Sequence, residues 1–296
     1  EITCTALVQE KLELLKQNTY NSVNSLLDTL ALDLAAKVDA KIAKGETIGL
    51  LEGIPFGIKD VYMVQGTYTT ASSDLLKNYK SPYTATAIQK LLDAGAIPLV
   101  RENCDSFGHG SSSENTIFGA VKNAIDPAFV AGGSSGGSAV NVAKNYTVFS
   151  IGGDTGGSVR QPAGYNHIYG LKPTYGRISR FGLMAYASST DCVGPLAKSI
   201  EDIRIVLNVM SGKDPKDQTS ITSSEISEEA IATSSVKTIG YFKNFIESDA
   251  IDAKIKSDFL ASIEKLKAKG IEVKELDFFK SDILVSTYYT LAMAET

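Results

Sequence analysis

Histidine, cysteine and long apolar segments are all scarce in this 296-residue sequence, and each scarcity excludes a class of function. The two histidines, His109 and His167, belong to no HExxH motif or other metal-ligand spacing, so we expect no metal ion. Serine nucleophiles usually take their proton acceptor from histidine. A serine enzyme with this composition therefore needs a different base.

The three cysteines, Cys4, Cys104 and Cys192, form no CxxC motif, and an odd, sparse set indicates buried thiols in a reducing compartment. No apolar run approaches the ~20 residues of a membrane helix, so we expect no membrane insertion. The sequence begins at Glu1 without a signal-peptide pattern, and we expect any targeting segment to have been removed already.

The charge of the chain is mildly acidic, since 29 Lys and Arg against 34 Asp and Glu give a net charge of −5. A protein that grips nucleic acid by itself usually presents a basic face. We therefore expect any nucleic acid to be bound mainly by a partner.

Apolar periodicity predicts an α/β fold with a mixed sheet. Apolar residues recur at three- and four-residue steps within residues 1–45, which indicates N-terminal helices that end near Gly45. A helix is predicted over 84–94 and a strand over 97–100, and Ser199 opens a further helix. The chain is thus predicted to be a single domain over 1–296. We expect this domain to be incomplete at its C-terminus, because the sequence stops in a helix-like stretch. Its predicted parts are N-terminal helices at 1–45, a catalytic core at 46–212, a surface excursion at 213–236 and a βαβ-like part of the same sheet at 237–296.

Two loops rich in glycine and serine lie close together in the sequence, at 132–138 and 152–158. A nucleophile for acyl transfer needs an exposed hydroxyl and nearby backbone N–H groups, and glycines let the backbone approach a substrate. The stretch from Thr155 to Ser158 offers both, with Ser158 as the hydroxyl. On spacing alone, a glycine-rich turn with an incidental serine remains an open interpretation.

Three other motifs compete for the same residues. The tripeptide DTG at 154–156 is that of aspartic proteases, but no second copy occurs. GxSxG at 132–136 fits the nucleophile elbow of α/β-hydrolases, although the one histidine after it, His167, follows Ser134 by only 33 residues (167 − 134). The glycines could also cradle phosphate, yet the GK[ST] ending of a P-loop is absent.

Lys59 is the candidate base. Lysine is usually a surface residue, but Lys59 lies in an apolar stretch that is typical of a buried strand. With an ordinary pKa of about 10.4 it would be protonated at neutral pH, so its site must be dry and must lack a close carboxylate.

The block from Gly132 to Arg160 closely resembles the signature of the amidase family. The resemblance implies an amidase-signature fold, in which helices on both faces cover a central mixed, twisted β-sheet. It also implies a Ser–cis-Ser–Lys triad, with Ser158 as the nucleophile, Ser134 as the serine after a cis peptide and Lys59 as the base. The spacings of 24 (158 − 134) and 75 (134 − 59) residues agree with the family pattern.

The resemblance further implies roles for residues around the triad. The oxyanion donors would be the backbone N–H groups of Thr155, Gly156, Gly157 and Ser158. Possible supporting residues are Ser135, Asp154 and Arg160.

Segments 107–115, 169–180 and 188–195 resemble, more narrowly, the A subunits of glutamyl-tRNA(Gln) amidotransferases, within a likeness from about Leu7 to Thr296. This implies a glutaminase that supplies ammonia from glutamine for the conversion of Glu-tRNA(Gln) to Gln-tRNA(Gln). The implied partners are a small linker protein and the amidotransferase B subunit, in a heterotrimer. We expect no cofactor on this chain, and ATP, Mg²⁺ and most tRNA contacts on the partner. Alternatives are a stand-alone amidase for another small or fatty amide and a catalytically silent scaffold.

Three positions depart from the family pattern. Gly153 replaces a small hydroxyl residue, His109 stands where Met is more usual, and Ala120 stands where Pro is common. None of these removes the triad. The departures and the composition favour an organelle form, so we expect the mitochondrial matrix, with the bacterial cytoplasm as the alternative.

Overall fold

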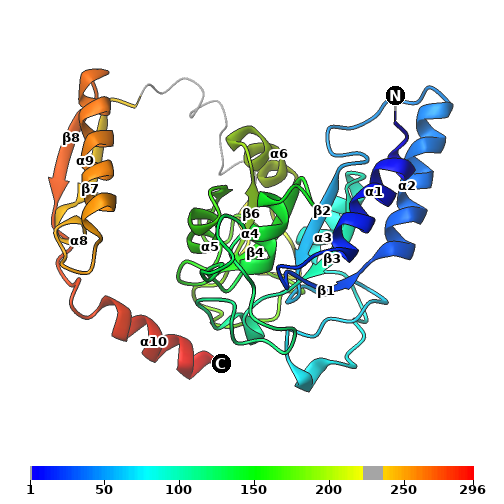
Figure 1. The fold of residues 1–296 in the computed structure, drawn as a ribbon, viewed down its shortest axis with the longest axis horizontal. Helices are drawn as coiled ribbons and strands as arrows, with labels where there is room; N and C mark the ends of the chain where they lie inside the picture. The colour runs from blue at the N-terminus through cyan, green and yellow to red at the C-terminus, as the bar shows by residue number, and fades with distance from the viewer. Residues whose placement is uncertain (1, 223–235) are drawn as a thin grey trace. The chain divides into compact units, whose positions relative to one another are not determined.

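The computed structural model describes residues 2–222 and 236–296 (Figure 1). Contacts between Cα atoms divide the chain into two compact units, Glu1–Glu225 with Glu295–Thr296, and Ile226–Ala294. Every helix in the described part of the chain is too short or too polar to span a bilayer. The assignment of all residues to one domain stays a prediction.

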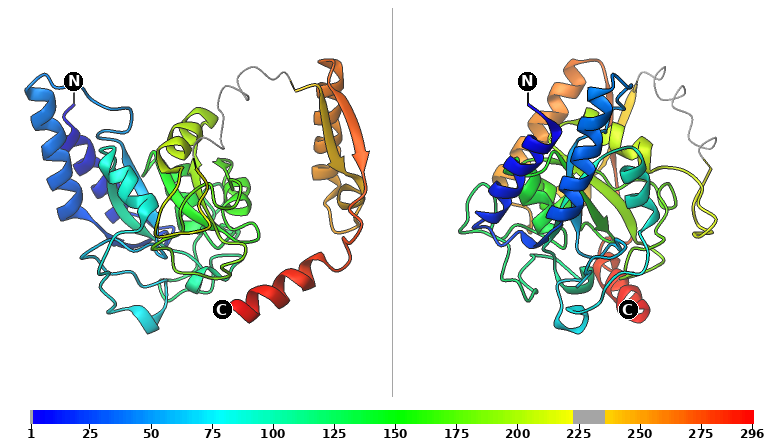
Figure 2. Two further views of the ribbon diagram at one scale, coloured as in Figure 1. Left: turned by 180° about the vertical axis from the view of Figure 1, so that it is seen from behind. Right: turned by 90° about the vertical axis from the view of Figure 1, so that its right-hand side faces the viewer.

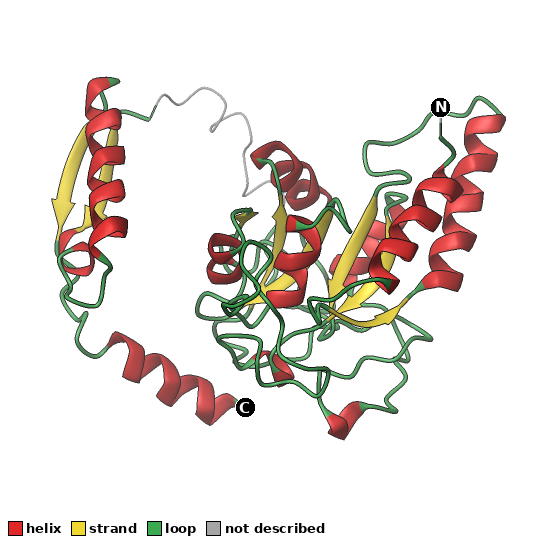
Figure 3. Ribbon diagram, in the orientation of Figure 1, coloured by secondary structure: helices red, strands yellow, loops and turns green. Residues whose placement is uncertain are grey.

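A six-stranded sheet forms the centre of the first unit, in the order β1-β3-β2-β4-β6-β5 (Figures 2 and 3). β2 is parallel to both of its neighbours, β3 and β4, whereas β1, β5 and β6 join the sheet by antiparallel pairing. The predicted mixed sheet is therefore confirmed. Its strands are β1 (Val23–Leu26), β2 (Pro55–Lys59), β3 (Ile97–Glu102), β4 (Phe149–Asp154), β5 (Tyr169–Gly170) and β6 (Cys192–Ala197).

Two helices of this unit begin at side chains that cap them. Thr3 and Ser199 accept hydrogen bonds from the N–H groups of Ala6 (3.1 Å) and Asp202 (3.0 Å) in the first turns. The predicted start at Ser199 is thus confirmed. The helices are α1 (Cys4–Lys16), α2 (Asp28–Ala43), α3 (Thr86–Asp93), α4 (Gly136–Ala143), α5 (Arg160–Tyr165) and α6 (Ile200–Met210), with short 3-10 turns η1 (Asp74–Leu76) and η2 (Ser106–Gly108).

Alternation along β2 separates the two faces of the sheet. Phe56 and Ile58 lie in the apolar cluster that α3 and α6 complete. Gly57 and Lys59 point to the opposite face, where α4 packs on β2. Helices therefore cover both faces, as predicted, and Lys59 lies on the side of α4.

The prediction of helices throughout residues 1–45 is wrong at one place. Residues Val23–Leu26 form β1, in which Val23 lies opposite Glu102 and Leu26 opposite Val100 of β3. The apolar spacing of this segment fits a helix, but the edge of β3 offers backbone groups that only another strand can pair.

The second unit holds a two-stranded parallel sheet of β7 (Thr238–Phe242) and β8 (Glu272–Leu276). The sequence prediction placed residues 237–296 in the sheet of the catalytic core, but within the described residues these strands pair only with each other. β7 alternates between exposed and half-buried residues and β8 is exposed except at Val273, whereas β2 is buried throughout. Strands that are covered on one face at most do not need an interior position. The helices here are α8 (Lys243–Ile246), α9 (Ala253–Ala268) and α10 (Leu284–Glu295).

The predicted surface excursion at 213–236 lies partly outside the described residues, which omit 223–235. Its first part is anchored. Asp214 and Asp217 are buried, and Asp214 Oδ2 accepts a hydrogen bond from Ser179 Oγ at 2.6 Å. This part of the segment therefore packs on the first unit and is not a free loop.

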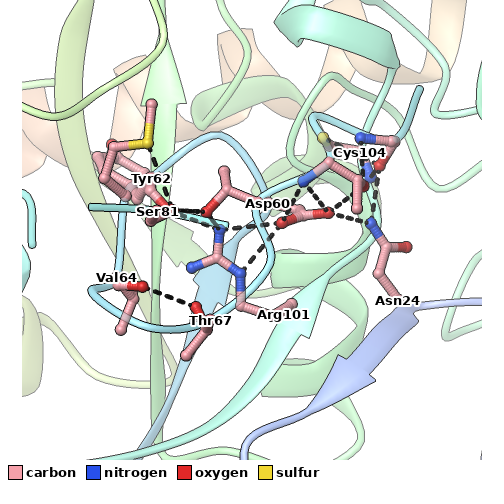
Figure 4. A network of polar contacts seen from close by, with 12 residues as sticks. Asn24, Asp60, Tyr62, Val64, Thr67, Ser81, Arg101 and Cys104 are labelled. Atoms are coloured by element: carbon pink, nitrogen blue, oxygen red, sulfur yellow. Dashed lines mark hydrogen bonds and ion pairs between the residues drawn. The ribbon is translucent and has the colours of Figure 1, made fainter. Parts of the chain in front are cut away.

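A buried ion pair joins β3 to the residue that follows β2 (Figure 4). Arg101 Nε and Nη2 donate to Asp60 Oδ1 at 3.1 and 2.9 Å, and Nη2 also donates to the Tyr62 carbonyl at 2.6 Å. Asn24 Nδ2 donates to the other carboxylate oxygen of Asp60 at 2.9 Å. Asp60 is next to Lys59 in the sequence, but its charge is directed to Arg101.

Glu102, the last residue of β3, fills a slot that Gly57 leaves open on β2. A Cβ at position 57 would overlap the Glu102 carboxyl and lie 2.7 Å from Ser150 Oγ. Glu102 Oε1 accepts hydrogen bonds from Ser150 Oγ (2.7 Å) and Asn141 Nδ2 (3.1 Å), whereas Oε2 has no partner among the described residues. Burial raises the pKa of Glu102 to about 7, because the neighbouring Ser138, Ser150 and Asn141 side chains and the charge of Arg101 offset it only in part.

Glu102→Gln should make the free energy of unfolding less dependent on pH. The carboxyl titrates at about 4.3 in the unfolded chain and at about 7 in the folded protein, so the folded state binds its proton more tightly. Wild-type stability should therefore fall as the pH rises between these values. At pH 8 the variant should be more stable than wild type by about 3 kcal/mol, and at pH 4 it should show no gain.

Chemical denaturation at both pH values measures this difference. Glu10→Gln, on the exposed side of α1, is the matched control and should change stability by less than about 0.5 kcal/mol at either pH. A Glu102→Gln variant that is less stable than wild type at pH 8 would contradict the raised pKa.

Candidate active site

Lys59 ends strand β2 and points its amine at the first glycine-serine loop. Its Nζ donates to Ser134 Oγ at 2.6 Å and to the Gly153 carbonyl at 3.5 Å. The lysine is only 1% exposed. The structure thus brings the predicted base to the predicted cis-serine across 75 residues of sequence.

The surroundings of Lys59 favour the neutral amine. Burial lowers the pKa of Lys59 below its ordinary value, and the more distant Cys104, Asp105, Asp154 and Asp191 oppose this only in part. Within the described residues, no Asp or Glu oxygen lies within 4.0 Å of Nζ. The site therefore offers both conditions for a lysine base, dryness and the lack of a carboxylate partner.

Ser134 follows a cis peptide bond from Gly133, as the resemblance implies, and is fully buried. A Cβ at position 133 would overlap the Asp105 carboxylate and lie 2.8 Å from the amide nitrogen of Ser113. Asp105 Oδ2 in turn accepts the Ser113 N–H at 2.9 Å. Only glycine fits at position 133, and this close packing presents the Ser134 hydroxyl to Lys59.

Ser158 lies on the second loop, shortly after β4, and is 8% exposed, more than Lys59 or Ser134. The two loops lie side by side, because the Ser135 N–H donates to the Ser158 carbonyl at 3.1 Å. A Cβ at Gly110 would lie 4.0 Å from Ser158 Oγ, so a third loop passes close to this hydroxyl. The loop of Ser158 therefore lies beside the loop of Ser134, and Ser158 is the most accessible of the three predicted triad residues.

Asp154, the last residue of β4, holds the second loop from inside. Its Oδ1 accepts the Gly157 N–H at 2.7 Å and its Oδ2 accepts the Val159 N–H at 3.1 Å, while the Arg160 guanidinium donates to both oxygens at 3.0 Å. Burial acts to raise the pKa of Asp154, but the hydrogen bonds and charge of Arg160 outweigh it and lower the pKa. The ionised carboxylate thus fixes the turn.

Of the four predicted oxyanion donors, Gly157 differs from the other three because its N–H already has an acceptor. The Gly157 N–H is bound to Asp154 and does not face an open site. Gly157 instead has a φ of 136°, which favours glycine, and so it serves the turn. In the part of the chain that the structure describes, the N–H groups of Thr155, Gly156 and Ser158 have no acceptor.

A pocket opens beside Lys59 with walls from segments far apart in the sequence. Its lining includes Lys59, Phe107, Gly108, Thr155, Met184 and Asp191. The sequence analysis gave Asp191 no role, although it lies in a segment that resembles the family. Its Oδ1 accepts the Thr155 hydroxyl at 2.6 Å, a contact that only the pairing of β4 with β6 reveals.

His109 and the three cysteines, which are residue types that can bind metal ions, lie in packed surroundings. The His109 ring packs against that of Tyr186 at a tilt of 44°, with centroids 4.5 Å apart, and its Nδ1 lies 3.1 Å from the Ser106 carbonyl. Across residues 2–222 and 236–296, no group of three or more His, Cys, Asp or Glu side chains is arranged to hold a metal ion. The predicted burial of the thiols is confirmed for Cys4, Cys104 and Cys192.

Comparison with known proteins identifies relatives over the whole chain. The family model described as Amidase matches residues 4–296. The A subunit of the glutamyl-tRNA(Gln) amidotransferase of Koribacter versatilis is 42% identical over 100% of this chain and 62% of its own length, and that of Gloeothece citriformis is 43% identical over 100% and 61%. The crystal structure of the corresponding Thermotoga maritima protein is 32% identical, with a TM-score of 0.83 over 100% of this chain and 65% of its own. The chain thus spans about three-fifths of the length of these curated relatives.

Gly133→Ala should destabilise the protein, because the added methyl group overlaps the buried Asp105 carboxylate. We expect a loss of about 1–3 kcal/mol in the free energy of unfolding. Gly164→Ala, inside α5 with no atom within 4 Å of the new Cβ, is the control and should gain about 0.5–1 kcal/mol. Urea denaturation measures both, and equal stability of the two variants would refute the close packing at Gly133.

Proposed function

We propose, because the chain belongs to the amidase family, that it is the glutaminase subunit of a tRNA-dependent amidotransferase. It would hydrolyse glutamine through an acyl-serine and supply ammonia to convert Glu-tRNA(Gln) to Gln-tRNA(Gln). The observation that carries this chemistry is the 2.6 Å hydrogen bond from Lys59 Nζ to Ser134 Oγ in a buried site without a carboxylate partner. The names of the amidotransferase relatives support the choice of substrate.

Ser158 is the proposed nucleophile, because it is the most exposed of the three triad residues. Its Oγ attacks the side-chain amide carbon of glutamine while its proton passes to Ser134 Oγ. In the reacting state the neutral amine of Lys59 acts as the acceptor, and the Ser134 hydroxyl proton moves to Nζ across the same 2.6 Å contact. Lys59 then returns a proton through Ser134 to the leaving nitrogen, and ammonia departs.

Water completes the cycle in the proposed second step. The Lys59 amine, neutral again after ammonia has left, accepts a proton from the attacking water through Ser134. Lys59 then returns this proton through Ser134 to Ser158 Oγ as the acyl–oxygen bond breaks, so glutamate leaves and both the serine hydroxyl and the neutral amine are restored.

Negative charge develops on the carbonyl oxygen in both steps. We assign the stabilisation of this charge to the N–H groups of Thr155, Gly156 and Ser158. In comparable sites, the loss of one such donor raises the activation free energy by ~3 kcal/mol. Two features keep this loop in place for that role. Asp154 and Arg160 fix its turn, and Ser135 donates its hydroxyl to the Gly153 carbonyl at 3.4 Å.

The proposal assigns ATP, Mg²⁺ and most tRNA contacts to a B subunit, which forms a heterotrimer with this chain and a small linker protein. It assigns no cofactor to this chain. The net charge of −5 supports this division. Of the two locations predicted from the sequence, the bacterial relatives favour the bacterial cytoplasm over the mitochondrial matrix.

Ammonia release from glutamine tests the function. The full-length protein is assayed alone and with its partner subunits, Glu-tRNA(Gln) and ATP, beside Ser158→Ala. Activity that needs the partners and vanishes in the variant supports the proposal. No turnover of glutamine in either setting, with turnover of another amide, would indicate a stand-alone amidase, and no activity on any amide would indicate a silent scaffold.

Lys59→Arg should abolish glutamine hydrolysis although it keeps a positive charge, because a guanidinium does not deprotonate in proteins. We expect a loss of at least about 10²- to 10⁴-fold in kcat. Lys59→Met should be equally inactive and should remain folded. Lys16→Arg on the surface of α1 is the control and should keep full activity. A Lys59→Arg variant with normal turnover would exclude Lys59 as the base.

The pH profile of kcat/KM should have an acidic limb that belongs to Lys59. The neutral amine is the active form, so activity should rise as the pH increases through the pKa of Lys59. Because burial lowers that pKa, the limb should lie well below about 10.4, the ordinary value for lysine. A profile that rises only near pH 10 would contradict the lowered pKa.

A further inference from the structure

Asp191 lies at the edge of the pocket, directly before β6, and is 4% exposed. Its Oδ2 accepts the Tyr186 N–H at 2.9 Å, and the Ala187 N–H donates to Oδ1 at 3.1 Å and to Oδ2 at 3.2 Å. The Thr155 hydroxyl donates to Oδ1 at 2.6 Å. One carboxylate therefore ties the turn before β6 to the loop after β4.

The register of the sheet explains why these two side chains meet. β4 and β6 are antiparallel, and their last paired residues are Asp154 and Cys192. One step further along each strand brings Thr155 opposite Asp191. Their side-chain hydrogen bond thus continues the pairing of β4 with β6 past the end of the backbone ladder.

This bond holds the start of the glycine-rich loop, whereas the Asp154 and Ser135 contacts hold the rest of it. Gly156 and Gly157 follow Thr155, and glycine allows the backbone many conformations. Asp154 fixes the far side of the turn through the Gly157 N–H. On the near side, the Thr155 hydroxyl is the side chain that anchors the loop to the rest of the protein, and Asp191 accepts it.

We propose that Asp191 is a positioning residue, whose carboxylate holds Thr155 and thereby aims the N–H groups of the 155–158 loop at the oxyanion. This rests on the proposed acyl transfer at Ser158. Asp191 acts through Thr155 and does not touch the reacting atoms. Oxyanion donors accelerate a reaction only when they are fixed before the charge develops, so a loose loop lowers kcat more than it weakens substrate binding.

Two substitutions at Thr155 separate the hydroxyl from the shape of the side chain. Thr155→Val keeps the shape and removes the donor, whereas Thr155→Ser keeps the donor. We expect Thr155→Val to lower kcat for glutamine by about 10- to 100-fold and to change KM by less than about 3-fold. Thr155→Ser should stay within about 3-fold of wild type in kcat. Thr190→Val, in the same turn as Asp191 but without contact to the loop, is the matched control.

A double-mutant cycle assigns the effect to the pair. Asp191→Asn should lower kcat in the wild-type background, and its effect should be much smaller when Thr155 is already valine, because the two residues act through one bond. The affinity for a boronic acid that forms a tetrahedral adduct with the nucleophile should fall with kcat. Thermal unfolding of Thr155→Val should match that of wild type, which separates positioning from a loss of fold.

The assays use the full-length protein with its partner subunits, and Ser158→Ala accompanies every series. Normal kcat in Thr155→Val, or fully additive effects of the two substitutions, would overturn the role of Asp191 while the proposed function stands. Ammonia release that persists in Ser158→Ala would instead overturn the proposed function itself.

Discussion

The site depends on one constraint, which is that Lys59 carries its amine in a dry place without a counter-ion. Burial of an unpaired lysine disfavours its ammonium form and therefore costs stability. The same cost lowers the pKa of Lys59, so the neutral amine that the proposed base requires is present at a lower pH than in an exposed lysine. On one face of the sheet, the apolar cluster around Ile58 keeps water away from β2. On the other face, the loop of Ser134 covers the Lys59 amine.

The carboxylates near Lys59 are compatible with this constraint because each is bound to other donors. Asp60, the neighbour of Lys59 in the sequence, forms a buried ion pair with Arg101 of β3. Asp154 and Asp191 are held by N–H groups and by Arg160 or the Thr155 hydroxyl. A carboxylate free to reach Lys59 would form an ion pair and keep the amine protonated. The polar network thus keeps these carboxylates from pairing with Lys59 as well as fixing the loops.

Features of the fold and the site were predictable from the sequence where the residues that determine them are close together in the chain. The helix after Ser199 was found because its cap and apolar face lie within a few residues of one another. The contact of Lys59 with Ser134 was anticipated through the resemblance of whole motifs, from which the triad is predicted. β1 was missed because its conformation depends on the edge of β3. Asp191 and the buried Glu102 received no role for the same reason, since each contacts a residue far away in the sequence.

The topology of the sheet explains why the parts of the site meet. β2 and β4 are adjacent and parallel, so their carboxyl ends lie at the same edge, where open α/β sheets place their ligands. Lys59 is the last residue of β2, and the loop of Ser158 leaves β4 at that edge. β6 runs antiparallel to β4 and therefore begins where β4 ends. An antiparallel pairing of β2 with β4 would put Lys59 and Ser158 at opposite ends of the strands. The parallel direction of these strands, more than the sequence spacing, therefore decides that the two residues lie at the same end of the sheet.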